Sequence, residues 1–417
     1  MFIALLATSA LAAPTAFVGA TIHPVSGDVI DGGVVVVDGT TLVAIGSEAE
    51  VEIPEDAVVV DVRGKVIIPG LVDTHSHIAS TGDLHESGIT PGVSAIDAID
   101  PTLPSIQRAQ AGGITTANIM PGSGTLVGGQ TAYVKMRDVN TVDAMLLCDD
   151  RREDICGGMK MANGTNPQGG KGPDGRMGAA YQHRTAFSEA RDKLDEPEAA
   201  PRKKKKHEQV GEAPDDADLD RDAMVQILEG DRIVHFHTHR ADDIVTALGM
   251  ADEFGFQVVL HHVSEAWKVT DVLAAHDARA SLILVDSPGG KEEAVEIRAH
   301  NAVALEEAGV MVALHSDDPI TDSRLFLRMG ALAVRAGMTR EGALKSLTLH
   351  GALMLGLEDR IGSLEVGKDA DLVVLSGDPF SVWTRVEQTW VDGVRVFDRS
   401  DPDDRRTAVG GLHPELP

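Results

Sequence analysis

Histidines and one aspartate stand directly after short apolar runs of the sequence, where their side chains could do metal chemistry. His75 and His77 follow the apolar run 66–72 with one residue between them. On an extended chain, residues i and i+2 point to the same side, so both imidazoles can face one ion. A lone His-x-His pair is more often chance than a ligand pair. Its position at the end of a predicted strand makes this pair a candidate.

Three more candidates occupy the same kind of position. His237, His262 and Asp317 each end a later apolar run, and imidazoles with a carboxylate suit a divalent ion such as zinc. Zinc can lower the pKa of a bound water to near neutrality. Considered alone, each of these residues could equally well be a buried polar residue whose hydrogen bonds are made within the protein. The neighbours expected only to pack or hydrogen-bond are His235, His239, His261, His315 and Asp318.

The apolar runs before these residues predict the strands of an α/β protein. They occur at 66–71, 113–119, 131–136, 158–161, 233–236, 258–260, 281–285 and 310–314. The runs do not alternate with polar residues, as expected for parallel strands buried on both faces. Strand and helix patterns alternate over residues 69–363, which predicts a (β/α)8 TIM barrel with insertions. A doubly wound open sheet is the alternative.

Both ends of the chain have the pattern of antiparallel strands. Asp38-Gly39 and Asp392-Gly393 each stand between two apolar runs, which predicts two hairpins. One small composite β-sandwich built from residues 13–68 and 364–400 leaves fewer exposed edges than two separate extensions. Three further segments are a signal peptide over 1–12, a mobile polar insertion over 191–222 and a tail over 401–417.

Composition bounds the partners and the location. The 417 residues carry 37 Lys+Arg against 65 Asp+Glu, a formal net charge of −28, which disfavours nucleic acid and anionic membranes. The expected partner is a small molecule, neutral or cationic, and a homo-oligomer is left open. The signal peptide predicts a periplasmic or secreted protein, although an N-terminal core strand is the alternative. In that setting Cys148 and Cys156 form either one disulfide or two buried thiols.

Four segments carry motifs that belong together in one known family. They are PGLVDTHSH at 69–77, AGGITT at 111–116, IGSLEVGKDADL at 361–372 and Asp392-Gly393. The chain resembles the metal-dependent amidohydrolase superfamily, specifically its imidazolonepropionase-like and prolidase-like branch. The resemblance implies a barrel with a composite β-sandwich. It also implies His75, His77 and His237 as metal ligands, His262 as ligand or carbonyl-polarising group, and Asp317 as ligand and general base.

Lys160, on the fourth predicted strand, bears on the number of metals. Some branches of the superfamily carry there a carboxylated lysine that bridges two metals, and others lack it and bind one. A buried lysine is costly unless its charge is paired or removed, and carboxylation would make it an anionic ligand. A lysine that reaches water at the rim is the alternative. The expected cofactor is therefore one or two divalent ions, zinc by preference.

These residues predict a hydrolase that cleaves an amide C–N bond of a cyclic amide or dipeptide-like small molecule. In the expected mechanism, a metal-activated water loses its proton to Asp317 and attacks a carbonyl polarised with the help of His262. Asp317 then passes the proton to the leaving nitrogen. The alternatives are an Xaa-Pro or other metallodipeptidase, and a barrel that binds metal and ligand without catalysis, because fold alone proves no activity.

Overall fold

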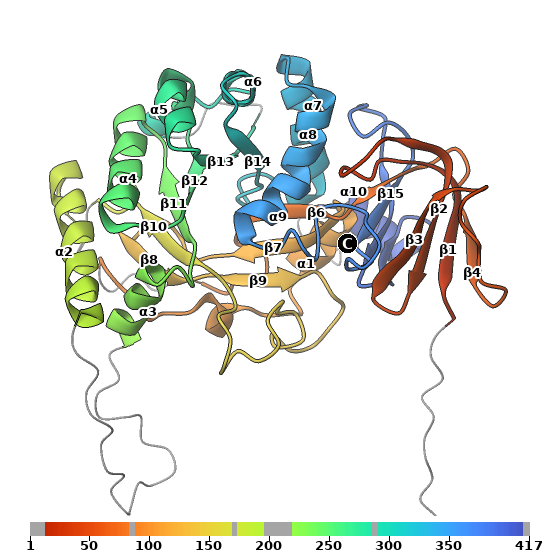
Figure 1. Cartoon of the computed structure of the whole chain (residues 1–417), viewed down its shortest axis with the longest axis horizontal. Helices are drawn as coiled ribbons and strands as arrows, with labels where there is room; N and C mark the ends of the chain where they lie inside the picture. The colour runs from red at the N-terminus through yellow and green to blue at the C-terminus, as the bar shows by residue number, and fades with distance from the viewer. Residues whose placement is uncertain (1–12, 83–87, 169–172, 196–218, 286–290, 412–417) are drawn as a thin grey trace, which may run out of the picture.

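The computed structural model describes residues 13–82, 88–168, 173–195, 219–285 and 291–411. Within these ranges the chain is an α/β protein, with one sheet from the two chain ends standing beside a body of parallel strands and helices (Figure 1). The segment 1–12, predicted as a signal peptide, lies outside the described ranges. Among the described residues, no helix is long and apolar enough to span a bilayer.

An eight-stranded sheet joins the two ends of the chain, in the order β17-β16-β15-β5-β1-β2-β3 with β4 paired to β1. Val373 of β15 lies opposite Ile68 of β5, which is where the C-terminal strands meet the N-terminal ones. Inside this sheet the rings of Phe17 and Trp390 contact each other edge to face at 5.0 Å. The strands are β1 (Thr15–Ile22), β2 (Ile30–Asp38), β3 (Thr41–Ser47), β4 (Val58–Asp61), β5 (Val66–Pro69), β15 (Leu372–Leu375), β16 (Val386–Val391) and β17 (Val394–Asp398).

The apolar runs between residues 66 and 314 all contain strands. All of these strands except Val66–Pro69, together with one unpredicted strand at Val127–Gln130, form two further sheets. A six-stranded sheet has the order β14-β13-β12-β11-β10-β8, in which β10 to β14 are parallel and β8 is antiparallel to β10. Its strands are β8 (Val127–Gln130), β10 (Met159–Ala162), β11 (Val234–Thr238), β12 (Val258–His262), β13 (Arg279–Leu282) and β14 (Met311–Leu314). A three-stranded sheet contains β6 (Leu71–Ser76), β7 (Ile114–Ile119) and β9 (Ala132–Lys135).

The arrangement differs from the expected ring of eight parallel strands in three ways, the first being the antiparallel strand β8, which lies in none of the predicted runs. The run 66–71 divides at Gly70, so that β5 belongs to the sheet of the chain ends and β6 to the three-stranded sheet. The chain passes close to Thr115 at this point, since a Cβ at Gly70 would lie 2.1 Å from Oγ1 of Thr115. Strand β9 runs antiparallel to β7. Across the gap between the two sheets, the backbone N of Asp317 donates to the carbonyl O of His75, at 3.0 Å. The ends of β6 and β14 therefore lie side by side.

Helices cover the sheets, and one of them shows how its sequence sets its bounds. In α4, Ile244, Ala247 and Leu248 are buried, and the helix ends at Gly255, whose φ of 78° suits a residue without Cβ. The helices are α1 (Pro104–Ala111), α2 (Arg176–Leu194), α3 (Leu219–Leu228), α4 (Ala241–Phe254), α5 (Thr270–Ala275), α6 (His300–Glu307), α7 (Phe326–Ala336), α8 (Arg340–Leu347), α9 (Leu349–Leu355) and α10 (Pro402–Val409).

Two predicted segments have other bounds in the structure. Residues 191–194 and 219–222 of the predicted insertion belong to helices α2 and α3, and the guanidinium of Arg191 lies 4.9 Å from the ring centre of Phe254. The intervening residues 196–218 lie outside the described ranges. In the predicted tail, Pro402–Val409 form α10, because the Asp401 carboxylate accepts hydrogen bonds from two backbone N–H groups and caps the helix. Cys148 and Cys156 form a disulfide.

A buried ion cluster joins strand β9 to the sheet of the chain ends. The ammonium of Lys135 lies 2.8 Å from Asp369, 2.9 Å from Asp371 and 2.8 Å from Asp392. The Lys135 side chain has no exposed surface. Burial alone would lower the pKa of Lys135, but the three carboxylates raise it above its ordinary value. The cluster therefore holds a charged lysine between the two parts of the molecule.

Candidate active site

The predicted site residues stand at or beyond the ends of adjacent strands. His75 lies in β6, with His77 one residue beyond the end of that strand. His237 and His262 lie at the carboxyl ends of β11 and β12, and Asp317 follows β14. Because β11 and β12 are parallel neighbours and β6 lies beside β14, these side chains reach one region.

His75, His77 and Asp317 converge on one point. Nε2 of His75 lies 3.4 Å, and Nε2 of His77 3.3 Å, from the same Oδ1 of Asp317. The Nδ1 of His77 lies 2.8 Å from the carbonyl O of Met120, a contact that fixes the orientation of the ring. Burial opposes ionisation of Asp317, yet the hydrogen bond and charge of His77 hold the pKa of that carboxyl below its ordinary value.

His237 and His262 form the second part of the site. Their ring centres are 4.4 Å apart. Ser123 Oγ lies 2.9 Å from Nδ1 of His237, and the amide nitrogen of Asn166 donates to Nε2 of the same ring at 3.2 Å. The Nδ1 of His262 lies 3.1 Å from Nε2 of His315. Both rings are thus held in place by partners on one or both nitrogens.

Lys160 lies within strand β10 and is fully buried rather than reaching water. Its side chain has no exposed surface, and its Nζ is 3.1 Å from Nε2 of His75. Burial first, and the Lys160 charge second, lower the pKa of His75 well below its ordinary value. The six predicted residues therefore occupy one connected region of the structure.

His239 and His315, predicted only to pack or hydrogen-bond, also have nitrogen atoms that could bind an ion. Three sets of side chains have ligand atoms close enough for one ion, and they are His75 with His77 and Asp317, His75 with His262 and His315, and His237 with His239 and His262. His239 stands two residues after His237, and His315 two before Asp317. The i, i+2 spacing that selected His75 and His77 would have found both.

Other neighbours have the packing roles expected of them. Nδ1 of His235 lies 3.0 Å from Nε2 of His261, and the hydroxyl of Tyr133 lies 2.9 Å from the other His235 nitrogen. The Asp318 carboxylate accepts a hydrogen bond from the backbone N of Ser323 at 3.0 Å. These groups form the buried polar layer against which the candidate ligands pack.

The residues fit a divalent metal ion. Nδ1 of His75 and Nε2 of His239 and His262 are buried atoms without a hydrogen-bond partner among the described residues. Burial lowers the pKa of His237 and His262 well below the ordinary value, so both imidazoles are neutral near pH 7, and His262 has an unpartnered Nε2. Neutral imidazoles beside one ionised carboxylate are the donor set that zinc prefers.

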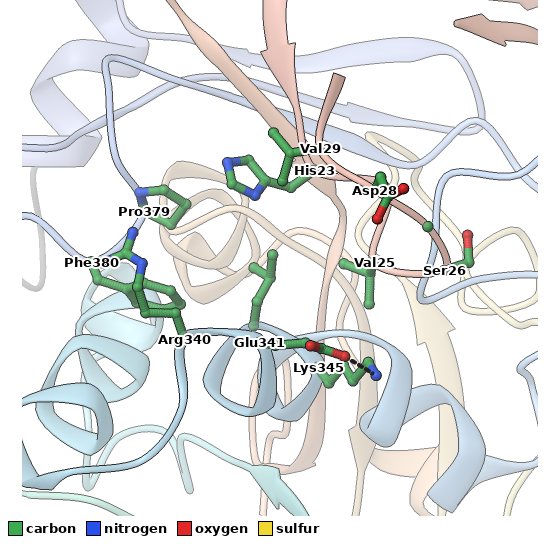
Figure 2. Close-up of a pocket in the computed structure, with 12 residues that line it drawn as sticks. His23, Val25, Ser26, Asp28, Val29, Arg340, Glu341, Lys345, Pro379 and Phe380 are labelled. Atoms are coloured by element: carbon green, nitrogen blue, oxygen red, sulfur yellow. Dashed lines mark hydrogen bonds and ion pairs between the residues drawn. The ribbon is translucent and has the colours of Figure 1, made fainter. Parts of the chain in front are cut away.

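A cavity of about 450 Å³ opens onto these groups. Five of the candidate ligands line it, namely His77, His237, His239, His262 and Asp317. A larger cavity, of about 520 Å³, lies between the sheet of the chain ends and α8 (Figure 2). Two of its lining cations are paired, Arg340 with Asp378 and Lys345 with Glu341, and no member of the three ligand sets lines the cavity. The chemistry therefore belongs to the smaller cavity.

Comparison with known proteins identifies the class. The model of the amidohydrolase family matches residues 205–397. The crystal structure of an amidohydrolase from Thermotoga maritima has 35% sequence identity and a TM-score of 0.82, over 92% of this chain and 100% of that chain. The chain therefore belongs to the amidohydrolase family, whose members are hydrolases that act on carbon–nitrogen bonds.

Two further relatives place the chain within the family. The imidazolonepropionase of Caulobacter vibrioides is 26% identical over 83% of this chain and 88% of that protein. Amidohydrolase tasK of Hapsidospora irregularis is 29% identical over 83% of this chain, which spans 38% of the length of that protein. A prolidase structure with 20% identity and a TM-score of 0.56 shares the fold. The imidazolonepropionase-like relationship indicated by the motifs is confirmed, and the prolidase structure supports the fold.

Proposed function

We propose that the protein is a metal-dependent hydrolase that cleaves the amide C–N bond of a small molecule, either a cyclic amide or a dipeptide-like compound. The observation that carries the proposal is the convergence of His75 and His77 on one oxygen of Asp317, at 3.4 and 3.3 Å. The imidazolonepropionase relatives support the cyclic amide. The polar groups of the cavity also suit a metallodipeptidase.

Each side chain has a separate task in this proposal. His75, His77 and His237 hold the ion, and His262 either joins them or polarises the substrate carbonyl. A divalent ion, zinc by our proposal, supplies Lewis acidity and a water of lowered pKa. Asp317 is ionised near pH 7, so its carboxylate can accept the proton of the nucleophile and then deliver it to the leaving nitrogen.

We also propose that the two inner sheets close into a (β/α)8 barrel around this site. The hydrogen bond from Asp317 N to His75 O, at 3.0 Å, supports closure between the first and last strands. Between β9 of the three-stranded sheet and β10 of the six-stranded sheet, the backbone N of Tyr133 in β9 donates to the carbonyl O of Cys156 at 2.8 Å. Cys156 lies shortly before the start of β10. Closure would hold His77 and Asp317 in fixed relation.

The experiment compares Asp317→Asn with His77→Ala in zinc-loaded protein. Asparagine keeps the shape and an oxygen but cannot take the proton. General acid–base catalysis is worth about two to four orders of magnitude, so Asp317→Asn should keep most of its metal and lose turnover at least roughly a hundredfold. His77→Ala should lose metal as well as rate.

The readouts are metal content by elemental analysis and initial rates on cyclic amides and dipeptides. An Asp317→Asn variant that turns over within a few-fold of the wild type would show that another group handles the proton. A zinc-loaded wild type that hydrolyses none of the amides would contradict the hydrolase itself.

A further inference from the structure

The imidazole of His237 has a hydrogen-bond partner on each of its two nitrogens. Oγ of Ser123 lies 2.9 Å from Nδ1, and the amide nitrogen of Asn166 lies 3.2 Å from Nε2. The other two members of its ligand set, His239 and His262, each have an Nε2 without a partner among the described residues. A neutral imidazole has one lone pair, and at His237 that lone pair already has a partner.

Lys291 decides which way the Asn166 amide faces. Nζ of Lys291 lies 2.7 Å from Oδ1 of Asn166, and an ammonium can only donate a hydrogen bond. The atom beside Lys291 is therefore the amide oxygen, which leaves the NH2 group on the side of His237. An amide NH2 group donates and does not accept, so Nε2 of His237 is the acceptor. The neutral ring then carries its proton on Nδ1, which donates to Ser123.

The buried carboxylate of Glu293 holds the segment 164–166 in this position. Its Oε2 accepts from the backbone N of Thr165 at 2.8 Å, and its Oε1 lies 3.2 Å from Nζ of Lys291. A Cβ at Gly164 would lie 2.6 Å from the same Oε2, so the chain can pass this close only without a side chain there. Glu293 thus fixes both the segment that carries Asn166 and the lysine that orients its amide.

We propose that the Asn166 amide and a divalent ion compete for the lone pair on Nε2 of His237, so that the ion binds His237 only when the amide withdraws. This inference rests on the ligand role of His237 in the proposed function, and it adds a residue that sets the metal affinity. Asn166 lines the cavity and is exposed, so its amide can exchange the imidazole for water. Withdrawal therefore costs about the net value of one hydrogen bond.

The proposal predicts opposite effects for the two partners of His237. Asn166→Leu keeps a side chain of similar size and removes the donor, so zinc affinity should rise about two- to tenfold. Ser123→Ala removes the partner that holds the ring through Nδ1, and loss of such a partner typically lowers metal affinity by about ten- to a hundredfold. Zinc affinity is measured by competition with a fluorescent chelator, and the number of bound ions by elemental analysis.

Two controls separate competition from a change in the segment itself. Gln168→Leu removes an amide of the same segment that donates to the carbonyl O of Gly164, and it should leave zinc affinity unchanged. With cobalt in place of zinc, Asn166→Leu should reach the visible absorption spectrum of the wild type at a lower cobalt concentration. Zinc affinity in Asn166→Leu at or below that of the wild type, a different cobalt spectrum, or an equal rise in Gln168→Leu would overturn the proposal.

These titrations use no substrate, so they separate this inference from the proposed function. His237→Ala tests the ligand role and should lower zinc affinity. If affinity falls in His237→Ala but does not rise in Asn166→Leu, the competition is wrong and the hydrolase stands. If affinity rises in Asn166→Leu and the wild type hydrolyses no amide, the competition stands and the hydrolase is wrong. Unchanged affinity in His237→Ala would remove His237 from the metal site and the inference with it.

Discussion

Lys135→Met removes the ammonium at the centre of the buried ion cluster and keeps a side chain of similar length. Asp392 retains Arg137 at 2.6 Å and Asp369 retains Arg360 at 3.0 Å, but Asp371 loses its cation. Removing one partner of a buried ion pair typically costs about 3–5 kcal/mol, because the other charge stays buried without compensation. We therefore expect the unfolding free energy to fall by about that amount.

The loss should depend on pH in a direction that follows from Asp371. Burial raises the pKa of this carboxyl above its ordinary value, and Lys135 acts against that rise. Without Lys135 the folded state holds the proton more tightly still, whereas the unfolded chain releases it near pH 4. The folded state then binds more protons than the unfolded one, so the stability of the variant falls as pH rises. The deficit should be smaller at pH 5 than at pH 8.

Urea titrations of wild type and Lys135→Met at both pH values, followed by circular dichroism, measure this. Lys345→Met is the matched control, since its partner Glu341 is exposed and surface pairs contribute little. Lys135→Met combined with Asp371→Asn should recover part of the loss, because the amide needs no counter-ion. A Lys135→Met protein as stable as the control variant at pH 8, or equally destabilised at both pH values, would refute the reasoning.

Two further predictions concern the sheet of the chain ends and the metal number. Deleting residues 364–417 should unfold or aggregate the protein, since β5 then loses its partner β15; a soluble truncated chain with unchanged melting would contradict this. If Lys160 is carboxylated, elemental analysis should find two metals, and Lys160→Ala should lower the count and regain part of it with a short-chain carboxylic acid. One metal in the wild type, unaffected by the substitution, would exclude a bridged pair.

The strands could be located from the sequence because parallel strands buried on both faces are short apolar runs. The pairing partners and directions of the strands could not be predicted, since the same apolar run can form a parallel or an antiparallel strand. The antiparallel β9 and the division of the run 66–71 at Gly70 depend on pairing with distant segments. Helix α10 had a readable local signal, the cap Asp401 followed by Pro402, in a segment that was predicted to be a tail.

Some residues of the candidate site could also be predicted from the sequence, and others could not. His75, His77, His237, His262 and Asp317 could be found because each follows an apolar run, and such positions meet at one end of parallel strands. Asn166, the partner of His237, could not be found in this way, because it carries no motif. Its hydrogen bond to Nε2 of His237 joins residues 71 apart in the sequence, and only the folded chain brings them together.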